Sequence, residues 1–246
     1  PQVQLTDFLP ELKFQGLRLG SAGLRAELWL DYQNENFNLV GNIEAHEIEL
    51  IDTEGHKEIV QRIDTTFKLS GHAEQDEVQL FLPDLSLIQD GEVLEFLDLN
   101  LIVEMMDGQY VVAGNLPSLD LGSLSSTLIR LNENINVIPE RGMTALVAMN
   151  LKGHFEEIIL YFDNSGDKPE MKLTSSIVGA SIEAYLGAPA ISALNGFVSL
   201  HPERGYVDIN NSAFDLHFAS MFPTSWPFDS TRGRVNYRLA DGVFHL

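Results

Sequence analysis

Cysteine is absent from this sequence, which excludes several kinds of chemistry. A chain without thiols forms no disulfide bond, offers no thiolate ligand to a metal and has no cysteine nucleophile. The absence does not fix the compartment, because a bacterial periplasmic protein can avoid stray oxidation simply by having no cysteine.

Positive charge is scarce as well. The 246 residues include 15 Lys and Arg against 36 Asp and Glu, so the formal net charge is −21. A surface this negative repels phosphate backbones, and we therefore expect no nucleic-acid partner. It also disfavours lying flat on an anionic lipid surface, and its simplest interpretation is solubility.

Long hydrophobic runs are missing too. No stretch approaches the ~18 uninterrupted apolar residues of a membrane-spanning helix, and we identify no signal peptide. The chain opens at Pro1 without a methionine, and we expect it to be a fragment or mature segment of a longer protein. Its hydrophobic fraction of 44% is normal for a globular protein.

Alternation of apolar and polar residues dominates the sequence and predicts β-strands. In "IDTTFKLSG" the side chains of Phe67 and Leu69 fall on one face, and in "EVQLFLPDLSL" Pro83 shifts the phase of the alternation. Asp-Gly pairs at 90–91 and 107–108 separate such runs and indicate tight hairpins. We predict roughly 15 short strands, joined mainly as an antiparallel meander.

The middle of the chain has helical spacing instead. Apolar residues from Leu121 to Leu131 recur every three or four positions, and Pro139 is well placed near the start of a second helix. Gly153 could end that helix. The sequence therefore predicts two short helices between two β-rich halves.

The predicted organisation has three parts. Residues 1–117 form an N-terminal β segment, 118–153 a short helical connector and 154–246 a C-terminal β segment. The pattern alone leaves two architectures open for the strands. One is a sheet closed around a dry core, and the other is a long curved sheet whose concave face stays open and apolar.

No motif for catalysis or metal binding stands out. "HEIEL" begins like a zincin motif, but Leu50 stands where the second histidine is needed. "DNSGDKPE" at 163–170 spaces hard oxygen donors that could bind calcium, yet it lacks the EF-hand glycine and terminal glutamate. No pair of carboxylates is singled out for glycoside hydrolysis. We predict no catalytic residue, no metal and no cofactor, and expect that the protein is not an enzyme.

Several short apolar motifs follow one another in the second half of the chain. They are "LPSLDLGSLSSTLIRL" (116–131), "IPERGMTALVAMNLKGHFEEIIL" (138–160), "ISALNGFVSL" (191–200), "RGYVDINNS" (204–212), "FDLHFASMFPTSWPFDS" (214–230) and "RGRVNYRL" (232–239). In this order they resemble the YhdP family of AsmA-like proteins of Gram-negative bacteria. The positions that match in the last third are Leu194, Gly196, Gly205, Ser212, Phe214, Leu216, Phe222, Gly233, Val235 and Tyr237.

The resemblance implies a function. The family is related to TamB and other bridge-like lipid transfer proteins, whose β-sheets curl into a groove that shields acyl chains as phospholipid moves toward the outer membrane. The implied location is the periplasm, with a tether to the inner membrane in the full-length protein. The implied partners are phospholipid and, through other parts of that protein, both membranes. The alternative is a non-catalytic β-sheet scaffold or protein-binding module of the cell envelope.

With this resemblance the predicted fold class is mainly β: a long curved antiparallel sheet, or sheets, forming an open apolar groove, with two short helices in the middle. Alternation then nominates the residues that face the groove, and an error of one position would invert a whole strand. The candidates are Phe67, Leu69, Leu80, Leu82, Leu97, Leu99, Leu101, Leu160, Phe162, Phe214, Leu216 and Phe218.

Near the end of the chain, Pro223 and Pro227 should prevent regular strand pairing. We expect Phe222, Trp226 and Phe228 to fold over the sheet there as a cap or an aromatic rim.

Overall fold

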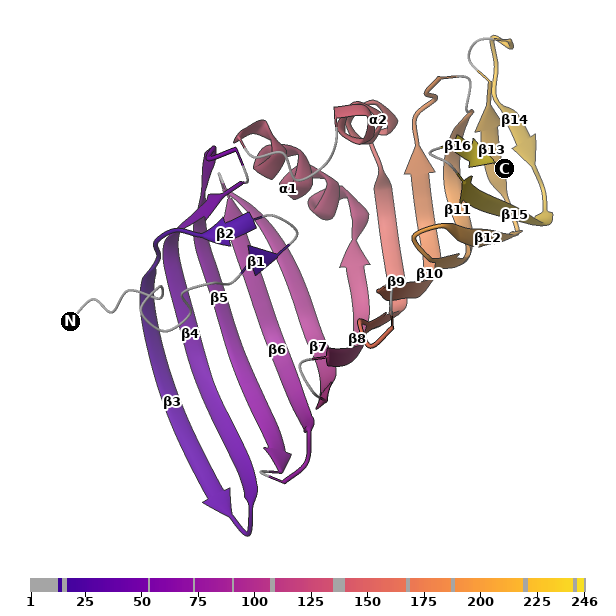
Figure 1. Cartoon of the computed structure of the whole chain (residues 1–246). Helices are drawn as coiled ribbons and strands as arrows, with labels where there is room; N and C mark the ends of the chain where they lie inside the picture. The colour runs from indigo at the N-terminus through magenta and orange to yellow at the C-terminus, as the bar shows by residue number, and fades with distance from the viewer. Residues whose placement is uncertain are drawn as a thin grey trace.

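Antiparallel strands make up most of the computed structural model, and the predicted fold class is confirmed (Figure 1). The structure describes residues 13–14, 17–52, 54–72, 74–89, 91–106, 109–134, 140–166, 169–186, 189–218, 221–240 and 243–245. Within these residues sixteen strands form a single sheet, and thirteen of them lie along one continuous path.

The strands are β1 (Lys13–Phe14), β2 (Leu17–Leu19), β3 (Gly23–Gln33), β4 (Asn36–Ile51), β5 (Lys57–His72), β6 (Glu77–Gln89), β7 (Glu92–Met106), β8 (Gln109–Asp120), β9 (Lys152–Asp163), β10 (Glu170–Ile182), β11 (Ala190–Leu200), β12 (Arg204–Asn211), β13 (Phe214–His217), β14 (Trp226–Phe228), β15 (Thr231–Ala240) and β16 (Val243–His245). The helices are α1 (Leu121–Asn134) and α2 (Glu140–Met149).

The sheet is a meander in which neighbours in sequence are mostly neighbours in space. From β4 to β12 every strand pairs with the next, and β3 pairs with β4 while β13 pairs with β11 and β14. Strand β8 pairs directly with β9, although both helices lie between them in sequence. The helices fall within residues 118–153, and one sheet runs without a break past both of them.

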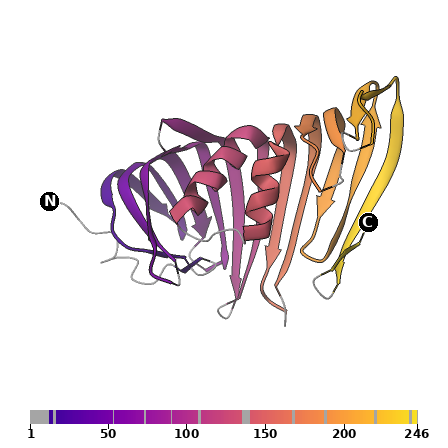
Figure 2. The same ribbon diagram turned by 90° about the horizontal axis from the view of Figure 1, so that it is seen from above.

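Both helices lie on one side of the sheet, which curls toward them at its N-terminal end (Figure 2). Asp120 caps α1, because its Oδ1 accepts a hydrogen bond from the backbone N–H of Ser123 at 2.6 Å. On the apolar stripe of the helix, Leu131 packs against a buried cluster that contains Ile48 and Val60. We call the face of the sheet that α1 covers the inner face.

Four strands break the simple alternation at a residue that is not glycine but has a positive φ. These residues are Glu47 (50°), Asp98 (54°), Glu157 (52°) and Ala193 (57°). At such a position the side chains two before and one after point the same way. Ala45 and Ile48, for example, pack in one cluster although three positions separate them.

Prolines face two of these residues. Pro83 lies opposite Asp98 and Pro117 lies opposite Glu157, and both pairs drop out of otherwise continuous ladders. Proline has no N–H to donate to a ladder, so it is tolerated where pairing is already interrupted. The bulge at Pro83 produces the phase shift that the sequence predicts within β6.

Because Glu157 has a positive φ and Glu156 does not, we expect glycine to affect stability differently at these two adjacent positions. Replacing Glu157 by glycine relieves a left-handed conformation that costs an L-residue about 1–2 kcal/mol, partly offset by greater freedom of the unfolded chain. We expect Glu157→Gly to leave the free energy of unfolding unchanged or to raise it by up to about 1 kcal/mol. Glu156→Gly, at an ordinary strand position, should lower it by about 0.5–1 kcal/mol. Urea unfolding measures both, and equal losses would contradict this account of β9.

Candidate functional site

One row of residues crosses eleven strands through direct cross-strand pairs and contains no charged side chain. We call it the leucine row, and its members from β3 to β15 are Leu30, Leu39, Leu69, Leu80, Leu101, Gly114, Leu160, Leu173, Leu200, Gly205 and Tyr237. Directly paired residues point to the same face. With strands about 4.8 Å apart, the ten intervals of this row span about 48 Å.

The leucine row lies on the inner face. Ile63 is on β5 with Leu69, an even number of positions away, and it packs against the same buried cluster as Leu131 of α1. A second uncharged row runs beside the first on strands β3 to β10, two positions away on each strand. Its members are Tyr32, Phe37, Gly71, Val78, Val103, Val112, Phe162 and Met171.

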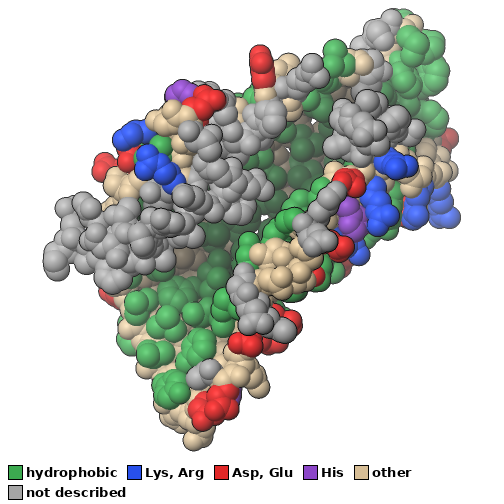
Figure 3. All heavy atoms as spheres, in the orientation of Figure 1, with side chains coloured by type: hydrophobic (Ala, Val, Ile, Leu, Met, Phe, Trp, Pro, Cys, Tyr) green, Lys and Arg blue, Asp and Glu red, His purple; other side chains and the backbone are tan. Residues whose placement is uncertain are grey.

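These two rows line an open groove rather than a dry core, because every member except Gly114 is half-buried or exposed. Leu28 is 56% exposed, Leu30 68% and Tyr32 58%, although all three point to the inner face. Figure 3 shows hydrophobic side chains gathered in a recessed strip on this side of the molecule. Helix α1 covers only part of the inner face, because its apolar stripe packs near Ile48 and Val60.

Glycine at one point of the leucine row lets its neighbours close over the backbone. A Cβ atom on Gly114 would lie 2.6 Å from Cδ2 of Leu101 and 3.7 Å from Cβ of Leu160. The two leucines flank Gly114 on adjacent strands, so their side chains share the space that a larger residue would occupy. The apolar lining is therefore continuous across this glycine.

Most of the residues that alternation nominates lie on the inner face. Leu69, Leu80, Leu101 and Leu160 belong to the leucine row, and Phe162 belongs to the row beside it. The register also places three further candidates on this face, namely Phe67, Leu82 and Leu99.

The prediction for Leu97 is wrong. Leu97 pairs with Asp84 on the outer face and is 52% exposed there, whereas the neighbouring pair Leu85 and Phe96 faces inward. The cause is the positive φ of Asp98, which inverts the alternation between Leu97 and Leu99. A sequence pattern shows which side chains alternate, but it does not show where a residue with positive φ interrupts the alternation.

The three C-terminal candidates have different surroundings. Phe214 is buried and stacks on Phe228 with ring centroids 5.2 Å apart, so it is part of the packing between β13 and β14. Leu216 pairs with Ile191 on one side and Trp226 on the other. Phe218 follows β13 and meets the Trp226 ring edge-on at 6.0 Å.

The aromatic stretch after β13 pairs more regularly than its prolines predict. Trp226, Pro227 and Phe228 form the short strand β14 against β13, so Pro227 does not prevent pairing. Strand β14 pairs with no other described strand, and an edge position tolerates a proline. Trp226 also packs on Phe222, with ring centroids 4.5 Å apart.

Sequence reasoning missed several members of the leucine row. Leu30, Leu39, Leu173 and Leu200 all carry the alternating signal, as in "LRAELWLDY" for Leu30. Alternation makes each of them a possible inner residue, but only the pairing of distant strands shows that they lie in one line.

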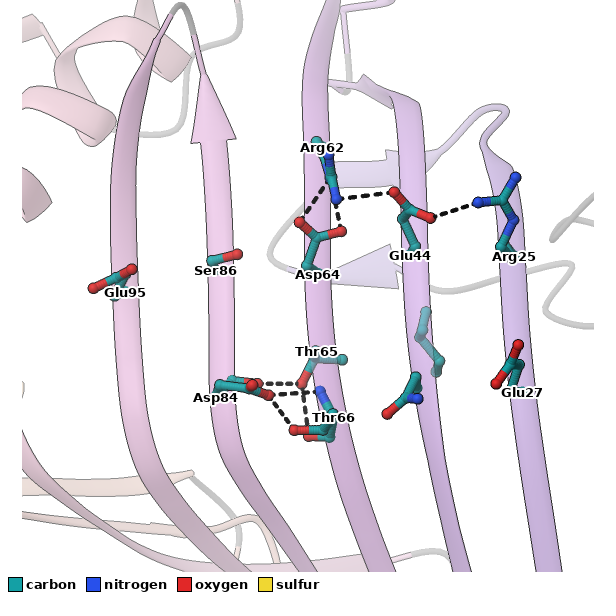
Figure 4. A pocket seen from close by; sticks show the side chains of 12 residues that line it. Arg25, Glu27, Glu44, Arg62, Asp64, Thr65, Thr66, Asp84, Ser86 and Glu95 are labelled. Atoms are coloured by element: carbon teal, nitrogen blue, oxygen red, sulfur yellow. Dashed lines mark hydrogen bonds and ion pairs between the residues drawn. The ribbon is translucent and has the colours of Figure 1, made fainter.

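The outer face carries a cavity that extends across the strands from β3 to β7 and is lined mainly by polar side chains (Figure 4). Within it Arg62 bridges two strands, because its Nη2 lies 2.9 Å from Oε1 of Glu44 and its Nε lies 2.7 Å from Oδ2 of Asp64. Arg25 joins the same Glu44 at 3.1 Å. Both guanidinium groups are therefore ion-paired, which fits a structural network across strands better than an anion site.

Thr66 and Asp84 form a second contact in this cavity. The hydroxyl and the backbone N–H of Thr66 both donate hydrogen bonds to Oδ1 of Asp84. Both hydrogen bonds lower the pKa of Asp84 below its ordinary value of 3.8, and the one from the Thr66 hydroxyl has the larger effect. The carboxylate is thus held ionised by a neighbouring strand.

Among the described residues, no group of three or more His, Asp or Glu side chains could hold a metal ion. Within the same residues, no helix is both long and apolar enough to cross a membrane.

Comparison with known proteins adds no relative. No family model, no curated protein and no solved structure matches this chain.

The Thr66–Asp84 contact predicts a pH-dependent coupling. Because the folded-state pKa of Asp84 is lowered, the stabilisation exists above the ordinary pKa and disappears as the pH falls through the folded value. In a double-mutant cycle of Thr66→Val and Asp84→Asn, we expect a coupling below about 1 kcal/mol at neutral pH, since the pair is solvent-exposed. Urea unfolding at about pH 7 and about pH 3 should show the coupling shrink at the lower pH. A coupling of equal size at both would refute the assignment.

Proposed function

We propose that the groove holds the acyl chains of phospholipid and that the protein is a non-catalytic segment of an intermembrane lipid transport protein of the cell envelope. The observation that carries the proposal is the leucine row, which offers an uncharged, open lining across eleven strands. Soluble proteins rarely leave so large an apolar surface open unless something binds to it.

The energetics favour a ligand with a long apolar part. Transferring an acyl chain from lipid to water costs about 0.8 kcal/mol per methylene group, or ~12 kcal/mol for sixteen carbons. A groove of leucine, valine and phenylalanine side chains removes most of this cost. A lining in which Tyr32 and Tyr237 carry the only side-chain hydrogen-bond donors of the two rows recognises apolar length rather than chemical detail. A charged head group can remain in water at the open side.

The resemblance to the YhdP family supplies the biological setting of this proposal. The order of the motifs from residue 116 to 239 supports a periplasmic location, a tether to the inner membrane and a role in outer-membrane lipid homeostasis. The groove and the resemblance are independent arguments, because one concerns side-chain direction and the other the order of motifs in the sequence.

Strand β3 offers a matched test. Leu28 and Leu30 point into the groove, whereas Trp29 between them points to the outer face and is 58% exposed. Each substitution removes an exposed side chain, so folding should change by no more than about 0.5 kcal/mol. We expect Leu28→Glu/Leu30→Glu to lower bound phospholipid about tenfold or more, because the acyl chains would have to displace water from the two carboxylates.

The measurement is solvent extraction of the purified protein followed by mass spectrometry of the lipids, normalised to protein. Trp29→Glu is the control and should keep the wild-type lipid content. Absence of phospholipid from the wild-type protein, both as purified and after incubation with vesicles, would overturn the proposal and leave a scaffold as the better explanation. An equal loss in both variants would also contradict it, since the effect would not depend on the inner face.

A further inference from the structure

Two neighbouring loops at the C-terminal end of the sheet expose large apolar side chains. Leu186, in the loop between β10 and β11, is 87% exposed. In the loop between β13 and β14, Met221 is 64% exposed, and Trp226 at its end is 42% exposed. We call Leu186, Met221, Phe222 and Trp226 the apolar rim.

The two loops start from adjacent strands. Ala190, at the first position of β11, pairs with His217, at the last position of β13. A hollow between their bases is lined by Glu183 from one loop and Ser225 from the other. The β13–β14 hairpin projects beyond the neighbouring strand ends in Figure 1, and hydrophobic side chains gather at the same corner in Figure 3.

The rim lacks charge in a chain that is rich in it. Residues 184–190 and 218–228 contain no Asp, Glu, Lys or Arg, although 21% of all residues are charged. The backbone also holds Leu186 outward in an uncommon conformation, with φ of 46°. A bulky residue rarely adopts a positive φ, and such strained positions are often functional.

We propose that the apolar rim inserts into the surface of a phospholipid bilayer and seats this end of the groove on it. The partner follows from the proposed function, on which this inference rests. Tryptophan and phenylalanine side chains at a protruding tip suit the boundary between head groups and acyl chains. Because the rim has no basic residue and the chain carries a net charge of −21, the membrane surface it fits is a neutral, zwitterionic one.

The rim is continuous with the inner face. Trp226 pairs with Leu216, Leu216 with Ile191, and Ile191 with Ile182. These pairs form an apolar line from the exposed tip into the sheet, and no charged residue interrupts it. A lipid that leaves the bilayer at the rim therefore meets apolar side chains from its first contact with the protein.

Tryptophan fluorescence can test this proposal, because the two tryptophans of the protein lie in different places. They are Trp29, on the outer face at the far end of the sheet, and Trp226 in the rim. In a Trp29→Phe variant, titration with phosphatidylcholine vesicles should shift the Trp226 emission to shorter wavelength, and brominated lipids should quench it. In a Trp226→Phe variant, the emission of Trp29 should not change.

A second pair of variants separates the rim from the groove. Leu186→Glu/Met221→Glu should lower the vesicle-bound fraction in flotation about tenfold or more, while the lipid that co-purifies in the groove stays at the wild-type level. Leu28→Glu/Leu30→Glu should do the reverse. Binding should not increase when phosphatidylglycerol is added to the vesicles.

The outcomes distinguish the two proposals. If vesicles bind through the rim but no lipid is found in the groove, the proposed function fails and the membrane contact stands. If lipid occupies the groove but neutral vesicles neither bind nor shift Trp226, the rim proposal is overturned, and a protein partner becomes the better explanation for the exposed side chains. Binding that survives Leu186→Glu/Met221→Glu would overturn it as well.

Discussion

The register of one antiparallel ladder is the constraint on which the rest of this structure depends. A domain with a closed core aligns its strands by burying one face of each, but here only twelve hydrophobic residues of the described chain are buried. Backbone pairing and tight hairpins therefore have to set the alignment. A slip by one residue on β5, for example, would turn Leu69 outward and bring Lys68 or Ser70 inward.

Apolar and charged side chains are separated between the two faces of the sheet. The inner face concentrates leucine, valine and phenylalanine, while charges such as those of Arg62 and Asp84 lie on the outer face, where they link neighbouring strands. This division leaves the charged groups of the outer face in contact with water. The protein's net charge of −21 makes copies repel one another, which opposes association through the groove.

Local properties of the fold could be predicted from the sequence, and non-local ones could not. Alternation around Leu69 and Leu160 predicts strands with one apolar side, and the spacing from Leu121 to Leu131 predicts a helix. The change of face at Asp98 was missed, since its left-handed backbone is set by the sheet around it rather than by aspartate itself. The alignment of eleven strands into one row depends on hairpin lengths and bulges that no single stretch of sequence records.

The repetition of leucine along the row also bears on how a bound apolar chain could move across the strands. Eight of its eleven members are leucine, so an apolar chain lying across the strands meets nearly the same surroundings after each step of about 4.8 Å. Dispersion contacts have no preferred direction, and none of these side chains offers a specific hydrogen bond except that of Tyr237 at the end. If the row binds acyl chains as proposed, no single position along it would hold a chain much more tightly than the next, and the chain could slide across the strands.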